Sequence, residues 1–152
     1  MSGILELSAF AISVFLVAAD QAAKLFVASS MRLGESIPVL AGIFHITYIE
    51  NPGAAFGMFA NQRWAFILAG VAVIAAACAM YRRLERESAM VRWGSALLLG
   101  GAAGNLIDRV RLGRVIDFLD FRVWPVFNIA DIGICVGVAC LIYALLREKE
   151  KE

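Results

Sequence analysis

The chain has few of the residues on which many enzyme sites depend. Of its 152 residues, only one is a histidine and three are cysteines. A site built from several histidines is therefore impossible, and a nucleophile–histidine pair would need His45, which no Gly-x-Ser-x-Gly motif accompanies. Cys78, Cys135 and Cys140 all lie in apolar runs without metal-ligand spacing, so we interpret them as small apolar side chains.

Charge is also scarce. Charged residues make up 18% of the chain and hydrophobic residues 61%, whereas soluble domains carry roughly 25% charged residues. A soluble domain of this size cannot bury so much apolar surface, because its interior is limited by its surface-to-volume ratio. The net charge of +1 gives no reason to expect a nucleic-acid partner. The composition thus predicts one integral-membrane domain covering residues 1–152.

Four apolar stretches run along the chain, and three of them are short for a membrane span. The run Trp64–Tyr81 has 18 residues, close to the roughly 20 that a helix needs to cross a bilayer. The runs Leu7–Ala19, Trp93–Ile107 and Ile132–Leu146 have only 13, 15 and 15 residues, so each must recruit polar residues at its ends. We therefore predict four transmembrane helices, over the approximate spans 5–25, 63–81, 91–108 and 130–147.

Aspartates occupy one end of each short run. The alternation of four helices places Asp20, Asp108 and Asp131 at the same membrane face. The short aspartate side chain reaches the interface poorly, and an ionisable residue at membrane depth is by default a functional candidate. Basic residues are equally numerous on the two sides, so their count does not decide the orientation. Their compact clusters beside the termini favour termini inside.

The segments between the helices contain two predicted strands. Ile43–Ile49 is rich in β-branched and aromatic residues, and Arg114–Trp124 is a second candidate that Pro125 ends. The outer segments 26–62 and 109–129 are thus expected to carry a small extracytoplasmic β element on a mostly α membrane protein. Such an element could hold an extended peptide by adding a strand, or serve only as a structural cap.

Two aspartates near the outer face form a candidate catalytic pair. Strand alternation separates Asp117 from Asp120, and Asn128 is a favoured N-cap type that would place Asp131 in the first turn of the last helix. A carboxyl pair can hydrolyse a peptide when one acid takes a proton from water and the other donates to the carbonyl. We expect Asp131 to ionise more readily, because it lies at a positive helix end. A helix cap at Asp131 and an arginine partner at Asp117 are the structural alternatives.

Five sequence blocks favour the catalytic interpretation of Asp117 and Asp131 over the structural alternatives. They read DQAAK at Asp20–Lys24, NPGAAFG at Asn51–Gly57, GNLIDR at Gly104–Arg109, VIDF at Val115–Phe118 and FNIAD at Phe127–Asp131. In this order, and over essentially the whole chain, they resemble the motifs of the lipoprotein signal peptidases (signal peptidase II). The 14-residue interval from Asp117 to Asp131 is shorter than in many relatives, and Ile132 replaces a frequent Ser or Thr.

The resemblance implies a fold, a cellular location and an activity. The family has four transmembrane helices with both termini in the cytoplasm, and its active site faces the extracytoplasmic side of the bacterial cytoplasmic membrane. Its members remove the signal peptide of prolipoproteins just before a diacylglyceryl-modified cysteine. Asp117 and Asp131 then correspond to the catalytic pair, and no metal or other cofactor is needed. The expected partners are diacylglyceryl-modified prolipoproteins and membrane lipids, and we expect a monomer.

Chemistry and resemblance together assign supporting roles. Asp20 and Lys24 are four residues apart on a helix, and we expect them to form a structural pair. Asp108 and Arg109 belong to a polar network or to a helix-ending ion pair, and the glycines around Gly100 favour close helix packing. The residues predicted to bind substrate or support the pair are Asn51, Gly53, Asn105, Asp108, Arg109, Asn128 and Ala130.

Two other functions are compatible with intramembrane acids. A small proton- or cation-coupled transporter would use them to carry charge, but no pair of interrupted helices recurs in the two halves of the chain. A non-enzymatic membrane scaffold would use the small residues of the last two helices as a docking surface. The scaffold predicts that Asp117 and Asp131 are dispensable.

Overall fold

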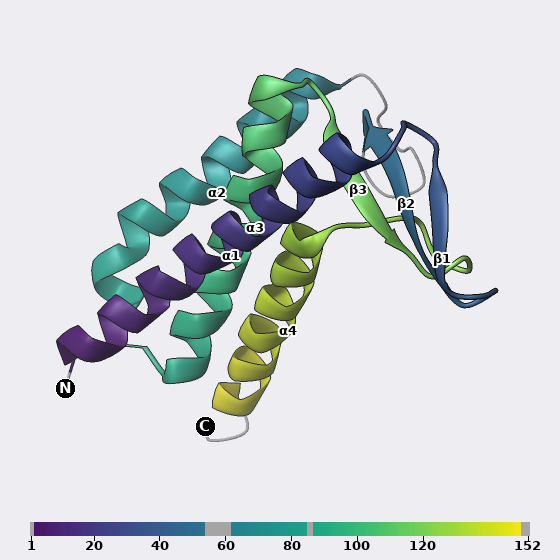
Figure 1. Cartoon of the computed structure of the whole chain (residues 1–152). Helices are drawn as coiled ribbons and strands as arrows, with labels where there is room; N and C mark the ends of the chain where they lie inside the picture. Colours follow the sequence, from purple (N-terminus) through teal and green to yellow (C-terminus); the bar gives the residue numbers. More distant parts are fainter. Residues whose placement is uncertain (1, 54–61, 85–86, 150–152) are drawn as a thin grey trace.

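The computed structural model describes residues 2–53, 62–84 and 87–149, so Ala54–Gly57 of the NPGAAFG block lie outside the described residues. Within these ranges the chain forms a bundle of helices with a small sheet at one end (Figure 1). The predicted spans 5–25, 63–81, 91–108 and 130–147 are all helical. The helices are α1 (Ser2–Ser30), α2 (Arg63–Leu84), α3 (Ala89–Arg111) and α4 (Ile129–Lys149).

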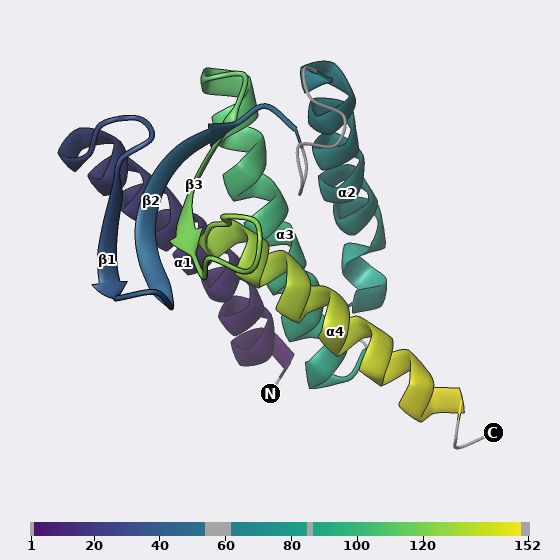
Figure 2. The ribbon, with the colours of Figure 1, turned by 90° about the vertical axis from the view of Figure 1, so that its right-hand side faces the viewer.

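Helix α3 is the centre of the bundle, and α1, α2 and α4 all pack on it (Figures 1 and 2). Small residues make this contact possible. A Cβ added to Gly100 would lie 2.9 Å from the carbonyl oxygen of Ser13 on α1, and one added to Gly101 would collide with the carbonyl oxygen of Ala130 on α4. The predicted close packing through these glycines is confirmed.

Apolar length distinguishes the helices. Among the described residues, Ser8–Ser30 and Ile129–Arg147 are long and apolar enough to cross a membrane, and Arg63–Ala79 is a shorter apolar stretch. Helix α1 continues well past the apolar run that ends at Ala19, because the charges beyond that run are buried and paired. Lys24 is 1% exposed and Asp20 is 0% exposed.

The sheet is antiparallel with strand order β1-β2-β3. Strands β2 (Phe44–Asn51) and β3 (Val115–Asp120) confirm the two predicted strands, although β3 is shorter than 114–124 because the chain turns at Arg122, whose φ is 65°. Strand β1 (Ser36–Leu40) was not predicted. It contains Pro38, which is tolerated there because β1 is the edge of the sheet.

A small core joins the sheet to the end of α1. It consists of Val27 from α1, Tyr48 from β2, and Ile116 and Phe118 from β3. Because strand side chains alternate, Ile116 and Phe118 face this core while the residue between them, Asp117, points to the other face of β3. The extra length of α1 therefore fixes the strand that carries Asp117.

Candidate active site

Asp117 and Asp131 come together from two different elements. Asp117 lies in the middle of β3, and Asp131 lies in the first turn of α4. Both line one cavity of about 610 Å³, together with Asn51, Asn105 and Arg109. The cavity wall is otherwise mainly apolar, with Trp124, Phe127, Ile132, Cys135 and Val136 among its lining residues.

The Asp117 carboxyl is buried and held by two asparagine amides. The Asn51 side chain donates to Oδ2 at 2.9 Å, and the Asn128 side chain donates to Oδ1 at 2.7 Å. Burial raises the pKa of Asp117 to about 7; the hydrogen bond from Asn51 opposes this rise, and the negative charge of Asp131 adds to it. Asp117 therefore retains a proton at a pH where an ordinary aspartate has lost it.

The Asp131 carboxyl is held by a side-chain amide and a backbone amide. The Asn105 side chain donates to its Oδ1 at 2.7 Å, and the backbone N–H of Asn128 donates to its Oδ2 at 3.2 Å. The backbone N–H of Asp131 returns a bond to Asn128 Oδ1 at 2.9 Å. The predicted N-cap at Asn128 is thus present as a reciprocal capping box. Asn128 is fully buried and binds both acids at once.

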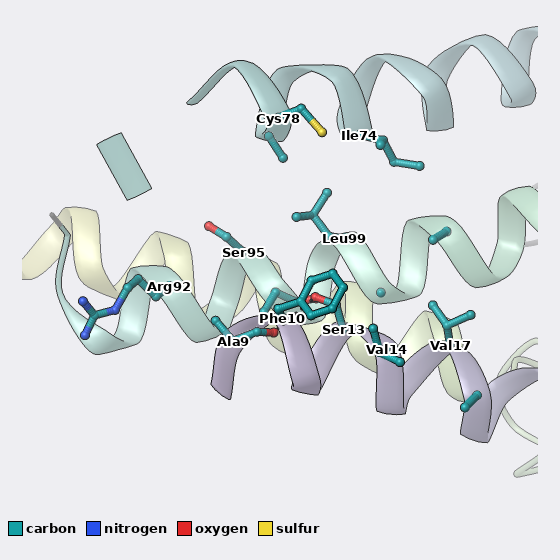
Figure 3. A pocket seen from close by; sticks show the side chains of 15 residues that line it. Ala9, Phe10, Ser13, Val14, Val17, Ile74, Cys78, Arg92, Ser95 and Leu99 are labelled. Carbon is teal, nitrogen blue, oxygen red and sulfur yellow. Dashed lines mark hydrogen bonds between the residues drawn. The ribbon is translucent and has the colours of Figure 1, made fainter. Parts of the chain in front are cut away.

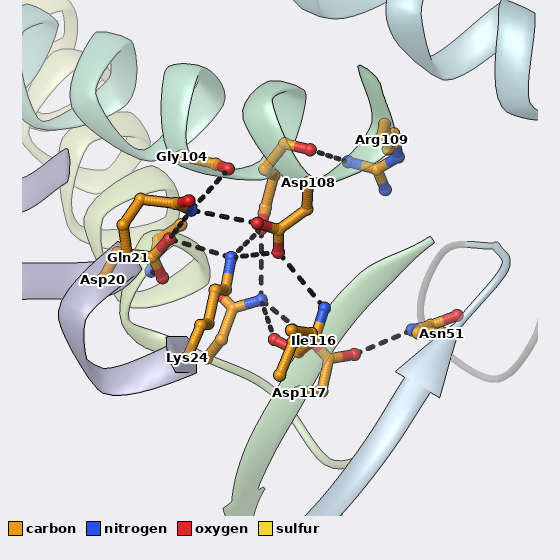
Figure 4. Close-up of polar contacts among 12 residues, drawn as sticks. Asp20, Gln21, Lys24, Asn51, Gly104, Asp108, Arg109, Ile116 and Asp117 are labelled. Carbon is orange, nitrogen blue, oxygen red and sulfur yellow. Dashed lines mark hydrogen bonds and ion pairs between the residues drawn. The ribbon is translucent and has the colours of Figure 1, made fainter. Parts of the chain in front are cut away.

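Beside this pair, Asp20 and Asp108 surround Lys24 and form a group that we call the Lys24 cluster (Figure 4). The Lys24 ammonium lies 2.8 Å from Asp20 and 2.8 Å from Asp108, and it donates to Asn105 Oδ1 at 3.0 Å. The predicted Asp20–Lys24 pair is therefore present, with Asp108 as a second partner. Because Asn105 Oδ1 accepts from Lys24, its amide nitrogen is directed to Asp131.

The Lys24 cluster also fixes the backbone next to each member of the pair. Asp20 Oδ1 accepts the backbone N–H of Ala130 at 2.9 Å, and Asp108 Oδ2 accepts the backbone N–H of Ile116 at 3.2 Å. Ala130 precedes Asp131 and Ile116 precedes Asp117. The role of Ala130 follows from this bond and from its complete burial, since its methyl group leaves room for α3.

Arg109 turns away from Asp108 toward the cavity. Its guanidinium lies 4.6 Å from the Phe66 ring centroid and donates to the carbonyl oxygens of Gly53 and Asn105, both at 3.4 Å. Asp108 pairs with Lys24, so the alternative of an Asp108–Arg109 ion pair at the helix end is not what the structure shows. The polar network predicted for these residues is present.

Two polar residues of this region were not predicted. The Gln21 side chain donates to Asp108 Oδ1 at 3.0 Å and to the Gly104 carbonyl at 3.2 Å, which joins α1 to α3. The Arg63 side chain donates to the carbonyls of Arg109 and Val110, both at 2.9 Å, and so caps the last turn of α3. Gln21 stood in the DQAAK block, but no sequence signal linked Arg63 to α3.

Asp120 lies apart from the pair, as strand alternation predicted. Burial disfavours its ionised form, but hydrogen bonds from Thr47 at 2.7 Å and from Arg122 outweigh burial and hold the pKa of Asp120 below its usual value. Asp120 does not line the cavity that Asp117 and Asp131 share. Among the described residues, no three His, Cys, Asp or Glu side chains are grouped as metal ligands.

Comparison with known proteins decides the family. The family model described as signal peptidase (SPase) II matches residues 12–147. The chain belongs to the signal peptidase II family. It is 43% identical over 141 residues to the lipoprotein signal peptidase of Halothermothrix orenii, covering 93% of this chain and 97% of that protein. It is 46% identical over 135 residues to the lipoprotein signal peptidase of Moorella thermoacetica, covering 89% and 90%.

Two solved structures share the fold of this chain. A bacterial membrane enzyme solved by the in meso method at 2.3 Å resolution superposes with a TM-score of 0.87 at 32% identity, covering 95% of this chain and 91% of that one. A second bacterial membrane enzyme, solved at 1.9 Å, gives a TM-score of 0.80 at 33% identity, covering 91% and 92%. The arrangement of helices and sheet is therefore that of a known membrane-enzyme fold.

Proposed function

We propose that this chain is a lipoprotein signal peptidase: an aspartic endopeptidase that removes the signal peptide of bacterial prolipoproteins just before a diacylglyceryl-modified cysteine. Its membership of the signal peptidase II family and the names of its relatives support the substrate class. The observation that carries the aspartic mechanism is the shared cavity of Asp117 and Asp131, in which Asn128 binds both carboxyls. Membership of this family argues against the transporter and scaffold hypotheses.

In the proposed mechanism, one acid of the pair starts protonated and the other starts ionised. Asp117 holds the proton, because burial raises its pKa to about 7. Asp131 accepts two hydrogen bonds that favour a carboxylate and lies at the positive end of α4. Asp131 then takes a proton from a water molecule as that water attacks the scissile carbonyl, and Asp117 donates its proton to the carbonyl oxygen. As the gem-diol collapses, Asp131 gives the proton taken from water to the leaving nitrogen and Asp117 takes back a proton from a hydroxyl group. The C–N bond then breaks, and both acids return to their starting states.

The surrounding residues are proposed to orient the pair. Asn51, Asn105 and Asn128 fix the carboxyl groups through the bonds described above. Gly53 donates its backbone N–H to Asn51 Oδ1 at 2.9 Å and thereby sets the direction of the Asn51 amide. Arg109 lies at the same cavity and is placed to bind a carbonyl of the extended substrate. The apolar wall contributed by α4 and by residues 121–127 suits the hydrophobic signal peptide.

We also propose that all four helices cross the cytoplasmic membrane, with both termini in the cytoplasm and the sheet outside. Ser8–Ser30 and Ile129–Arg147 meet the length and hydropathy of a span, and the approximate spans remain 5–25, 63–81, 91–108 and 130–147. Many large apolar side chains of the helices are exposed, including Phe15 at 75% and Leu68 at 67%. A bilayer removes the unfavourable contact of such side chains with water.

The test is cleavage of a synthetic diacylglyceryl-modified precursor peptide by the detergent-purified chain. We expect Asp117→Asn and Asp131→Asn each to lower kcat by at least about 10²–10⁴-fold, since each removes one proton-transfer group. Asp120→Asn is the matched control, because Asp120 lies on the same strand and is buried but faces away from the cavity. Asp120→Asn should retain most of the activity. Full cleavage by both dyad variants would refute the proposal.

A further inference from the structure

The structure contains a groove that shares no described lining residue with the cavity of Asp117 and Asp131. Its volume is about 660 Å³, and it lies between α1 and α2 with α3 as its floor (Figure 3). It exists because α1 and α2 both pack extensively on α3 but hardly on each other. Phe10 and Val14 line it from α1, Ile74 from α2, and Leu99 and Ala103 from α3.

The groove is almost entirely apolar along its length. The Ser13 hydroxyl, which also lines it, donates to the carbonyl oxygen of Ala96 at 2.8 Å and is thus already used within the protein. Phe10 is 69% exposed and Val14 is 51% exposed. Side chains of this kind in a hollow of this size call for an apolar occupant.

One end of the groove carries a positive charge. Arg92 lines the groove near the beginning of α3 (Figure 3), at the end of the bundle where both chain termini lie (Figure 1). The N-terminal turn of α3, capped by Ser88, adds the positive end of a helix dipole. A guanidinium matches the geometry of phosphate oxygens. The polar end therefore suits an anionic phosphate group.

The length of the groove matches that of a single lipid acyl chain. Ala103 follows Arg92 by eleven positions, which is about 16 Å along a helix. The hydrocarbon core of a bilayer is about 30 Å thick, so the groove spans one leaflet.

We propose that this groove binds an anionic phospholipid, with one acyl chain along α3 between α1 and α2 and the phosphate on Arg92. The lipid holds apart the two helices that carry Lys24 and Arg63, and so braces the scaffold of the catalytic cavity from the opposite leaflet. This inference rests on the membrane embedding proposed above but not on peptidase activity, so lipid binding and precursor cleavage are measured separately.

The first test is native mass spectrometry of the full chain in detergent, titrated with phosphatidylglycerol or phosphatidylcholine of identical acyl chains. We expect phosphatidylglycerol to bind about five- to tenfold more tightly, the advantage of one arginine at a membrane surface. Glycerol 3-phosphate, which has the phosphate without the chains, should not bind. Equal affinity for the two lipids, or binding of glycerol 3-phosphate as strong as that of the lipid, would overturn the proposal.

Variants locate the binding site. Arg92→Gln should lower phosphatidylglycerol affinity to that of phosphatidylcholine, whereas Arg147→Gln, which removes a charge at the same end of the bundle but outside the groove, should not. Ala77→Phe fills the groove and should weaken both lipids, while unchanged thermal melting shows that the variant is folded. The proposal fails if Arg92→Gln and Arg147→Gln behave alike, or if the groove instead holds a second copy, seen as a dimer mass that Ala77→Phe abolishes.

Discussion

Two pairs of aspartates lie side by side in this molecule, and they differ in what surrounds them. Asp20 and Asp108 share the ammonium of Lys24 at 2.8 Å each. Asp117 and Asp131 share the neutral amide-bearing residue Asn128, with one further asparagine for each acid. An ion pair fixes a carboxylate in one charge state, whereas amides orient a carboxyl and leave its proton free to move. The first pair is suited to structure and the second to proton transfer.

The largest effect should come from breaking the ionic pair. Lys24→Met leaves Asp20 and Asp108 buried without a cation, and we expect the free energy of unfolding to fall by about 3–5 kcal/mol. Thermal unfolding in detergent measures the loss. The matched control adds Asp20→Asn and Asp108→Asn to Lys24→Met, which removes the uncompensated charges and should recover much of the stability. A single variant as stable as the wild type would show that the ionic pair does not support the fold.

The next effect concerns the proton on Asp117. With its pKa near 7, kcat/KM should fall about tenfold per pH unit above that value, because deprotonation removes the acid that donates to the carbonyl. The folded-state pKa lies above the ordinary value of 3.8, so the native state binds the proton longer than the unfolded state. Stability should therefore decrease as pH rises from about 4 to 7.

The Asp117→Asn variant isolates this contribution to stability. Its melting temperature should change less than that of the wild type between pH 4 and pH 8, because position 117 no longer titrates. If the melting temperatures of the two proteins changed equally with pH, Asp117 would have an ordinary pKa. Another group would then cause the fall of kcat/KM at high pH.

The smallest effect should come from removing one amide. Asn51→Ala deletes a hydrogen bond that favours the ionised form of Asp117, so the alkaline limb of kcat/KM should move upward by about 0.5–1 pH unit. Thr47→Val is the control, since it removes an equivalent bond to Asp120. A shift produced by both variants would show that the limb responds to the sheet and not to the Asn51 amide.

Local patterns predicted the elements of the site. Period-two alternation separated Asp117 from Asp120, and residue type at Asn128 predicted the helix start that presents Asp131. Apolar run length located all four helices, although their ends extend beyond the runs because Asp20 and Lys24 are buried as a pair. The ordered motif blocks, more than the spacing of the acids, were what favoured a catalytic over a structural role for Asp117 and Asp131.

Contacts between helices could not be predicted in the same way. The link from Lys24 to Asp108 and the cap that Arg63 places on α3 depend on how each helix is rotated and how far it is shifted along its neighbour. Hydropathy in a membrane protein does not specify that rotation, because lipid-facing and buried residues are similarly apolar. Strand β1 was missed for a different reason, since Pro38 is compatible with a strand only once the edge position is known.

Asn128 gives the site a built-in order of assembly. The same side chain ends the loop after β3, starts α4 and binds Asp117. A chain that ends after β3 already carries Asp117 and Asn51, but it lacks the Asn128 amide, which is the second of the two that hold this acid, and it lacks Asp131. On the proposed catalytic role of Asp117 and Asp131, the site is therefore complete only when the first turn of α4 has formed.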